Sequence, residues 1–196
     1  MDLFTVLETV IRNRRSSKPA LMNGKKIDDK IVASLLELAD WAPTHGHTEP
    51  WRFIVYGGNS VSSFGNDHAE LYKAVTPEEK FNTATYEKLA HNGDTVSHVI
   101  LAVMKRGNNP KIPALEEEAA VAAAIEHILL GASALGIAAL WSTGGLTHHP
   151  AMKSYLGLTH EDVVMGLLYL GYSDEKEKEG KRIIPLTEKV KWIEQG

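Results

Sequence analysis

A cluster of cationic and hydroxyl side chains follows the first amphipathic segment of the chain, in the stretch Arg14-Arg15-Ser16-Ser17-Lys18. Guanidinium groups bind phosphate oxygens, and a hydroxyl and the backbone N–H groups freed at a helix end can converge on the same anion. The stretch therefore predicts a phosphate site. The alternative is a solvated helix end whose cations interact with the helix dipole. A second basic pair, Lys181-Arg182, indicates nothing by itself.

A glycine-containing turn is the second stretch that could carry chemistry. The run GIAALWSTGG over residues 136–145 ends in small side chains and two glycines. Such a turn can present backbone N–H groups to a flat heteroaromatic ring at close range. The run lacks the G-x-G-x-x-G spacing, which disfavours a Rossmann dinucleotide site. An ordinary glycine turn is the alternative interpretation.

Two histidines, His45 and His47, lie in the unusual stretch WAPTHGHTEPWRF over residues 41–53. They could begin a metal site, with His148-His149 supplying further ligands. No third ligand type is spaced in support, and neither H-E-x-x-H nor a carboxylate-histidine cluster is present. We therefore predict no metal site. The alternative is a polar loop between a helix and a strand.

Composition limits the classes of function. The 196 residues are 43% hydrophobic, which is enough for one good core, so we predict a single domain over residues 1–196. The net charge of -4 and the pI near 6.1 give no general bias toward nucleic acid or an anionic membrane. The absence of cysteine excludes thiolate nucleophiles, disulfides, iron-sulfur clusters and cysteine-bound zinc. Redox chemistry would therefore need a bound cofactor.

Hydrophobic periodicity predicts strands separated by helices, which is typical of an α+β or α/β domain. The predicted helices cover residues 2–13, 28–41, 61–74, 77–90 and 111–136, and the predicted strands cover residues 52–56, 97–105, 137–141 and 163–172. The helix over 77–90 is assigned to a capping box, Thr76-Pro-Glu-Glu79. Residues 173–182 read as a solvated loop, and residues 183–193 as an arm too apolar to be left exposed.

Neither a secretory signal nor a membrane span is predicted. The N-terminal segment mixes acidic and basic residues and has no small-residue cleavage site. The most apolar segment, residues 119–141, is interrupted by Glu126-His127 and by two glycines. It therefore reads as a buried helix followed by a strand, with a membrane span as the less favoured alternative. A cytoplasmic location is expected.

Four stretches together resemble the nitroreductase family of FMN-dependent oxidoreductases. These are RRSSKP, WAPTHGHTEPWRFIVY, AAIEHILLGASALGIAALWSTGG and GYSDEKEKEGKRIIP, in this order and spacing. The similarity spans nearly the whole chain and is closest to the short NAD(P)H nitroreductases. It implies an α+β, nitroreductase-like fold with a central mixed sheet surrounded by helices. It also implies an intertwined homodimer with two FMN sites at the interface.

The resemblance further implies which residues contact FMN. The phosphate would be held by Arg14, Arg15 and Ser16, with Lys18 nearby and Arg182 as a second ligand. A loop from the partner chain, which carries Trp41, His45 and His47, would lie near the flavin. The isoalloxazine ring would be covered by the turn that contains Trp141, Ser142, Thr143 and Gly144. Catalytic side chains beyond these are not implied, because FMN carries the hydride chemistry.

Some residues depart from the family pattern. His47 replaces Asn, Glu49 replaces the Gln before Pro-Trp, and Trp41 replaces a basic side chain of close relatives. Glu126-His127 replaces a Gln-Asn pair. An added carboxylate near the flavin would oppose the anionic reduced form, which bears on acceptor preference and turnover. The residue of the family that contacts the flavin from the middle of the chain has no clear counterpart within residues 61–92.

The function implied is an FMN-dependent NAD(P)H oxidoreductase. Hydride would pass from NADH or NADPH to the flavin and then to a small acceptor, such as a nitroaromatic, a quinone or another small electrophile. Two alternatives stay open at this point. One is an FMN-binding protein with little turnover, which stores or senses flavin. The other is a histidine metal site at His45 and His47.

Overall fold

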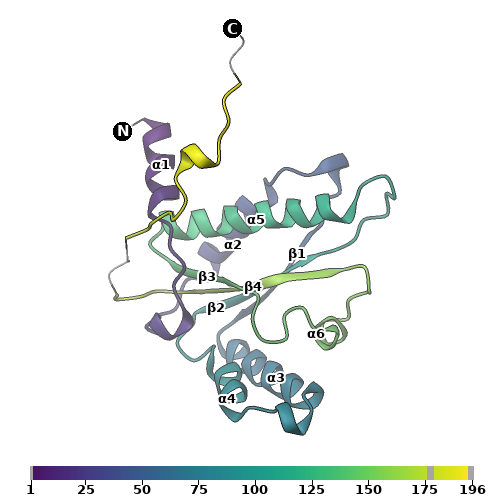
Figure 1. Ribbon diagram of the computed structural model, residues 1–196. Coiled ribbons are helices and arrows are strands. Elements are labelled where there is room, and N and C mark those ends of the chain that lie inside the picture. Colours follow the sequence, from purple (N-terminus) through teal and green to yellow (C-terminus); the bar gives the residue numbers. More distant parts are fainter. Residues whose placement is uncertain (1, 176–178, 194–196) are drawn as a thin grey trace.

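A four-stranded antiparallel sheet forms the centre of the computed structural model, which describes residues 2–175 and 179–193 (Figure 1). The strand order is β1-β2-β4-β3, and the bounds are Trp51–Gly57 for β1, His98–Met104 for β2, Ala138–Ser142 for β3 and Val163–Gly171 for β4. A mixed sheet was expected, whereas all three strand pairs are antiparallel. Among the described residues, an isolated bridge between Ser16 and Ala139 supplies the parallel component.

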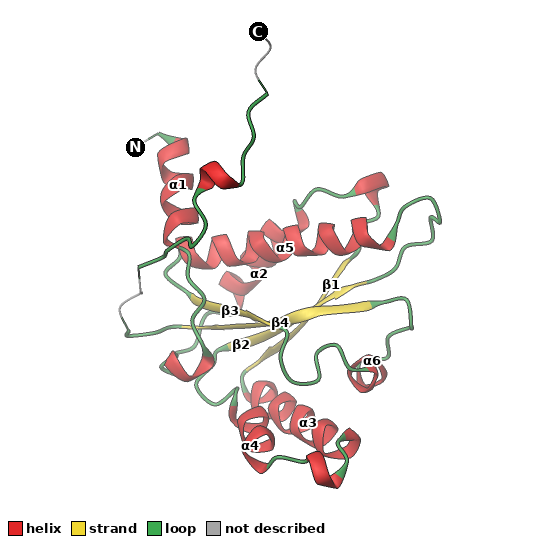
Figure 2. Ribbon diagram, viewed as in Figure 1, coloured by secondary structure: helices red, strands yellow, loops and turns green. Residues whose placement is uncertain are grey.

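Helices cover both faces of this sheet (Figures 1 and 2). On one face lie α2 (Asp29–Asp40) and the long α5 (Ala114–Ala134). The other side carries α3 (Asn59–Val75), α4 (Thr83–His91) and the short α6 (Pro150–Tyr155). The first helix, α1 (Leu3–Asn13), projects beyond α5. The result is the expected α+β arrangement of a sheet surrounded by helices.

Alternation along the strands builds two separate hydrophobic cores. Successive side chains of a strand point to opposite faces, and every residue of β2 is buried. Ile100 and Met104 belong to the core under α2 and α5, whereas Val99 and Leu101 belong to the core under α3 and α6. Burial on both faces explains why this strand reads as a continuous apolar run.

Two local predictions differ from the structure. The helix expected over 77–90 begins only at Thr83, because Asn82 caps it by accepting the Thr85 N–H at 3.0 Å. Residues 78–80 instead form a separate 3-10 turn, so the proposed capping box at Thr76 does not start an α-helix. The short helix α6 was not predicted, since six residues are too few to show a helical period.

The two ends of the described chain expose much apolar surface. No residue of α1 is buried, and Leu3 and Phe4 are 88% and 73% exposed. The arm over residues 183–193 extends away from the body of the chain, with Trp192 84% exposed (Figure 1). The arm was expected to be covered, and its own chain does not cover it. Within the charged loop that precedes the arm, residues 176–178 lie outside the described part of the chain.

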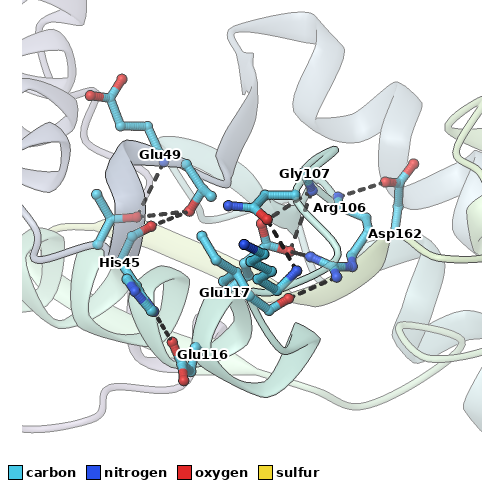
Figure 3. Close-up of polar contacts among 12 residues, drawn as sticks. His45, Glu49, Arg106, Gly107, Glu116, Glu117 and Asp162 are labelled. Carbon is cyan, nitrogen blue, oxygen red and sulfur yellow. Dashed lines mark hydrogen bonds and ion pairs between the residues drawn. The ribbon is translucent and has the colours of Figure 1, made fainter.

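A buried ion pair joins the segment that follows β2 to the first turns of α5 (Figure 3). Glu117 is 1% exposed and accepts hydrogen bonds from the Arg106 guanidinium and, at 3.1 Å, from the Gly107 N–H. Beside it, Lys105 Nζ lies 2.7 Å from Asp162, which is also buried. Burial alone would raise the pKa of Asp162, but the hydrogen bonds from Lys105 and from backbone N–H groups hold it below its usual range.

Replacing Arg106 with Met should destabilise the protein by about 3 to 5 kcal/mol, because it leaves the Glu117 carboxylate buried and unpaired. The matched control is Arg12→Met, which removes an exposed pair with Glu8 and should cost less than about 1 kcal/mol. Urea unfolding at pH 7 measures both free energies. Equal losses in the two variants would show that the buried pair has no special role.

Candidate functional site

The basic stretch over residues 14–18 lies along the edge of the sheet, next to β3. The Ser17 N–H donates to the Ala139 carbonyl at 2.9 Å, and Ser16 forms the parallel bridge to the same residue. Helix α1 ends before this stretch, because the backbone of Arg14 leaves the helical region at φ -57° and ψ 127°. Pro19 then begins a short 3-10 turn. The sheet edge thus fixes the register of the stretch.

A cavity of about 430 Å³, here called the basic cavity, opens beside this stretch. Its cationic residues are Arg15 and Lys18, and Glu175 lies on the same wall. The Arg15 guanidinium donates to the carbonyl oxygens of Arg12 and Arg14 at 2.7 and 2.8 Å. The complete lining comprises Arg15, Ser16, Ser17, Lys18, Ala20, Leu21, Gly136, Ala138, Ser173 and Glu175.

A second cavity of about 320 Å³, here called the turn cavity, adjoins the first. Lys18 and Ala20 line both cavities, so the two lie next to each other along the N-terminal stretch. Ser142 and Gly144 bring the glycine turn to this second wall. The other lining residues are Pro19, His68, Thr85, Lys88, Leu89, Asn92, Leu140, Gly145 and Tyr169. The structure therefore brings together two stretches that are more than a hundred residues apart.

A further cavity, of about 580 Å³, lies elsewhere, beside α2 and β1. Lys26, Asp29 and the buried His98 line it. No residue that the sequence singled out for phosphate or ring binding belongs to it. Size alone therefore does not mark the site, and the basic and turn cavities together are the candidate.

The glycine turn is held by hydrogen bonds from both sides. The Thr147 hydroxyl donates to the Gly144 carbonyl at 2.6 Å, and the Leu146 N–H donates to His68 Nε2 at 3.0 Å. Gly145 has a φ of +64°, and a Cβ atom there would lie 2.8 Å from the His68 ring. Only glycine satisfies both constraints. Close packing with α3 therefore shapes the cavity wall.

His68 is a neutral acceptor in this arrangement. Burial lowers the pKa of His68 to about 4 from an ordinary value of 6.5, because the imidazolium ion is poorly solvated there. At neutral pH the ring therefore keeps a free lone pair on Nε2 for the Leu146 N–H. This histidine was not among the residues that the sequence singled out, since an isolated histidine in a helix carries no motif.

Helix α4 and its cap bring mid-chain residues to the turn cavity. Thr85, Lys88 and Asn92 line the turn cavity from one face of this helix and its cap. Tyr169 of β4 lines the same cavity. Their spacing of three and four residues is the helical signal that could have identified them as a group. Of the three, Lys88 adds a second cation to a cavity that already contains Lys18.

Only some of the predicted phosphate ligands line the basic cavity. Arg15, Ser16 and Lys18 line the basic cavity, whereas the Arg14 side chain points to α5 and lies 3.6 Å from Glu126. Arg182 is exposed and is not among the lining residues. The chain nevertheless passes this cavity, because a Cβ atom on Gly180 would lie 2.5 Å from the Arg15 guanidinium.

Trp141 lies on the opposite face of the sheet from the turn cavity. Alternation along β3 directs Ala138, Leu140 and Ser142 toward the cavities, and directs Trp141 toward the core under α5. The indole Nε1 donates to the Met165 carbonyl at 2.9 Å and occupies the space beside Gly166. Its indole is therefore not part of the cavity wall. Thr143 is exposed and also lies outside the lining.

The histidine loop lies at the far end of α5. His45 Nδ1 is 2.5 Å from Glu116 in the first turn of that helix (Figure 3), whereas the basic cavity contains Gly136, beyond its last turn. The 21 residues of α5 span about 30 Å. Within one chain, His45 therefore does not reach the candidate site, and neither Trp41 nor His47 lines either of its cavities. Its donation to a partner chain stays a prediction.

Neither a metal cluster nor a membrane helix is found in the parts of the chain that the structure describes. No group of three or more histidine and acidic side chains is placed to hold a metal ion among residues 2–175 and 179–193. Within the same ranges, every helix is too short or too polar to cross a bilayer.

The antiparallel sheet flanked by helices is the fold of a nitroreductase. The chain belongs to the nitroreductase family, whose sequence pattern matches residues 11–172. The matched range runs from the last residues of α1 through the end of β4. The family resemblance expected from the four stretches is therefore confirmed.

Individual relatives agree with this assignment. The Bacillus subtilis protein named "Putative NAD(P)H nitroreductase YfhC" is 28% identical over 182 residues, which cover 91% of this chain and 90% of that protein. A solved nitroreductase-like family protein from Bacillus cereus is 30% identical, with a TM-score of 0.84 and 100% of each chain covered. The FMN-dependent nitroreductase NfnB of Mycobacterium smegmatis, solved with NADPH, shares the fold at 16% identity, with a TM-score of 0.73 and coverage of 98% and 100%.

Acid should destabilise the protein partly through His68. The native pKa of about 4 lies below the ordinary value of 6.5, so the stability contributed by neutral His68 is complete above pH 6.5 and is lost as the pH falls toward 4. The loss should be about 2 to 3 kcal/mol at pH 4.5. Urea unfolding of His68→Gln should show this part of the pH dependence removed, while the exposed control His160→Gln keeps it. If the stability of His68→Gln and that of His160→Gln depended on pH in the same way, the assignment would be contradicted.

Proposed function

We propose that this protein is an FMN-dependent NAD(P)H oxidoreductase that reduces a nitroaromatic, a quinone or another small electrophilic acceptor. The observation that carries the proposal is the pair of adjoining cavities joined by Lys18, one lined by Arg15 and Ser16 and the other by the glycine turn. Family membership and the names of the relatives support the reaction class. The geometry supports the position of the cofactor.

The basic cavity fits the phosphate end of FMN. Arg15 and Lys18 supply two positive charges against the single carboxylate of Glu175, and Ser16 supplies a hydroxyl at the sheet edge. These are donors that a dianionic phosphate accepts from. Arg14 could join them by leaving Glu126, a pair whose 3.6 Å separation and partial exposure make it weak. Arg182 follows Gly180 on the chain that passes Arg15, so the second basic pair lies near the first.

The turn cavity fits the ring end of FMN. Gly144 of the turn leaves room for a flat ring to approach the backbone, and Leu89 and Leu140 give the cavity apolar walls. Lys18 and Lys88 place two cations on the same cavity, where they stabilise negative charge on a bound ring. When bound, FMN would accept hydride from NADH or NADPH and pass electrons to the acceptor. The chain itself binds, orients and shields the ring.

We further propose that the functional unit is a homodimer. The apolar side chains of α1 and of the arm over residues 183–193 leave more apolar surface in water than a folded monomer usually exposes. A second copy of the chain would cover both and would bring the histidine loop of one subunit toward the candidate site of the other. An interface of the obligate class, above about 2,000 Å² in total, is expected.

Purified protein should carry noncovalent FMN, and the phosphate should account for much of its affinity. In Arg15→Gln, loss of a charge-assisted hydrogen bond of about 1.5 to 3 kcal/mol should weaken FMN binding about tenfold or more. Riboflavin, which lacks the phosphate, should bind the variant and the native protein alike. Fluorescence titration of the flavin-free protein gives both dissociation constants, and Arg12→Gln, on the exposed part of α1, is the matched control.

A second experiment tests turnover. The protein with FMN is mixed rapidly with NADH or NADPH, and the loss of flavin absorbance and its return on addition of a quinone are recorded.

The titration and the rapid-mixing measurement together separate the candidate functions. Protein that neither carries FMN nor takes it up would overturn the proposal. Protein that binds FMN tightly but is not reduced by either nicotinamide would be a flavin-binding protein with little turnover. An equal loss of FMN and riboflavin affinity in Arg15→Gln would mean that Arg15 supports the fold and does not contact the phosphate.

The dimer proposal predicts complementation between two damaged chains. Chains with Arg15→Gln and chains with His45→Ala should each bind FMN weakly, whereas a mixed dimer should regain one intact site of its two. Titration of flavin against purified mixed dimers counts the sites. Sedimentation should show a dimer for the native chain and dissociation when residues 183–196 are removed. A stable monomer with bound FMN would contradict the proposal, and sites formed within one chain would leave every mixed dimer damaged.

A further inference from the structure

His68 is a buried titratable group whose role the proposed function does not require. It lies on α3 with 2% exposure, and its ring is one wall of the turn cavity. Phe64 packs against it with the ring centroids 5.7 Å apart, and Gly145 fits against the ring edge on the side of the turn. The imidazole is thus fixed between its own helix and the glycine turn.

The hydrogen bond from the turn defines which nitrogen of the His68 ring carries the proton. The Leu146 N–H can only donate, so His68 Nε2 must accept at 3.0 Å, and the proton of the neutral ring then lies on Nδ1. Leu146 is itself buried, so without His68 its N–H would be a buried donor without this partner. An imidazolium ring would place two donors face to face at this contact.

The turn cavity that His68 lines contains other titratable side chains. Lys18 from the N-terminal stretch and Lys88 from α4 line the same cavity, and Tyr169 lines it from β4. The neighbouring acid on α3, Asp67, is engaged by the Tyr155 hydroxyl at 2.7 Å. No acid is thus placed to stabilise an imidazolium ion through a contact seen among the described residues, and burial lowers the pKa of His68.

Resting on the function proposed above, we propose that His68 is a positioning residue that holds the Gly144–Leu146 backbone in place before the flavin binds. It acts through the Leu146 N–H and does not contact the acceptor. A turn fixed in advance needs no ordering when the ring enters, which strengthens binding. The same contact makes the cavity wall sensitive to a single proton on His68.

A purely packing role makes different predictions. If His68 only fills space between α3 and the turn, an aromatic ring of similar size would replace it. Phenylalanine keeps the ring but offers no acceptor to Leu146, whereas glutamine loses the ring but offers an amide oxygen. The order of these two variants therefore distinguishes the hydrogen bond from the packing.

The test combines hydrogen exchange with flavin titration on the full-length protein. In His68→Phe, without FMN, the amide of Leu146 should exchange about tenfold faster than in the native chain, and FMN binding should weaken by a similar factor. His68→Gln should recover most of both values. The control His160→Phe alters an exposed histidine and should change neither. Peptides that cover residues 142–148 report the exchange by mass spectrometry.

Each outcome decides the proposal. Native exchange and native FMN affinity in His68→Phe would overturn it. A native chain that binds no FMN would defeat the proposed function, whereas Leu146 exchange in the flavin-free protein would still test the contact. If neither variant folds, nitrogen NMR of the native protein decides. The expected spectrum shows an unprotonated Nε2 on His68 from pH 7 to pH 5, and a proton on Nε2 at neutral pH would overturn the proposal.

Discussion

The candidate site depends on the alternation of side chains along the edge strand β3. Ala139 and Trp141 point into the core under α5, and this packing fixes the strand. Leu140 and Ser142 then point to the other face, where the turn cavity lies. On the side away from β4, the backbone of the same strand pairs with Ser16 and Ser17. A single strand thereby positions both the basic stretch and the glycine turn.

Two kinds of buried polar contact maintain the geometry at opposite ends of the fold. At the start of α5, Glu117 ties Arg106 and Gly107 to the helix that carries Glu116, the partner of His45 (Figure 3). Near the cavities, His68 ties α3 to the turn. The first contact uses full charges, and the second uses a neutral ring. Since a buried group without its partner is costly, both ends resist local rearrangement.

Much of this arrangement follows from sequence pattern, and the remainder depends on contacts between distant residues. The apolar runs in β2 and β4 indicated interior strands, and the basic stretch and the glycine turn indicated the region that now forms the candidate site. Pattern could not show that the Trp141 indole turns away from that site, because the choice of face depends on pairing with β4 and on the space at Gly166. It also missed His68 and the α4 face, whose residues acquire meaning only when α3 and α4 pack against the turn.

The position of the apolar arm in the chain has a consequence for biosynthesis. The last strand of the sheet ends at Gly171, and the arm over residues 183–193 follows it. All four strands are therefore translated before the arm, and the central core has its complete set of strands when the arm leaves the ribosome. None of the three core clusters uses a side chain of the arm, so the packing of the core does not depend on the residues that are translated last.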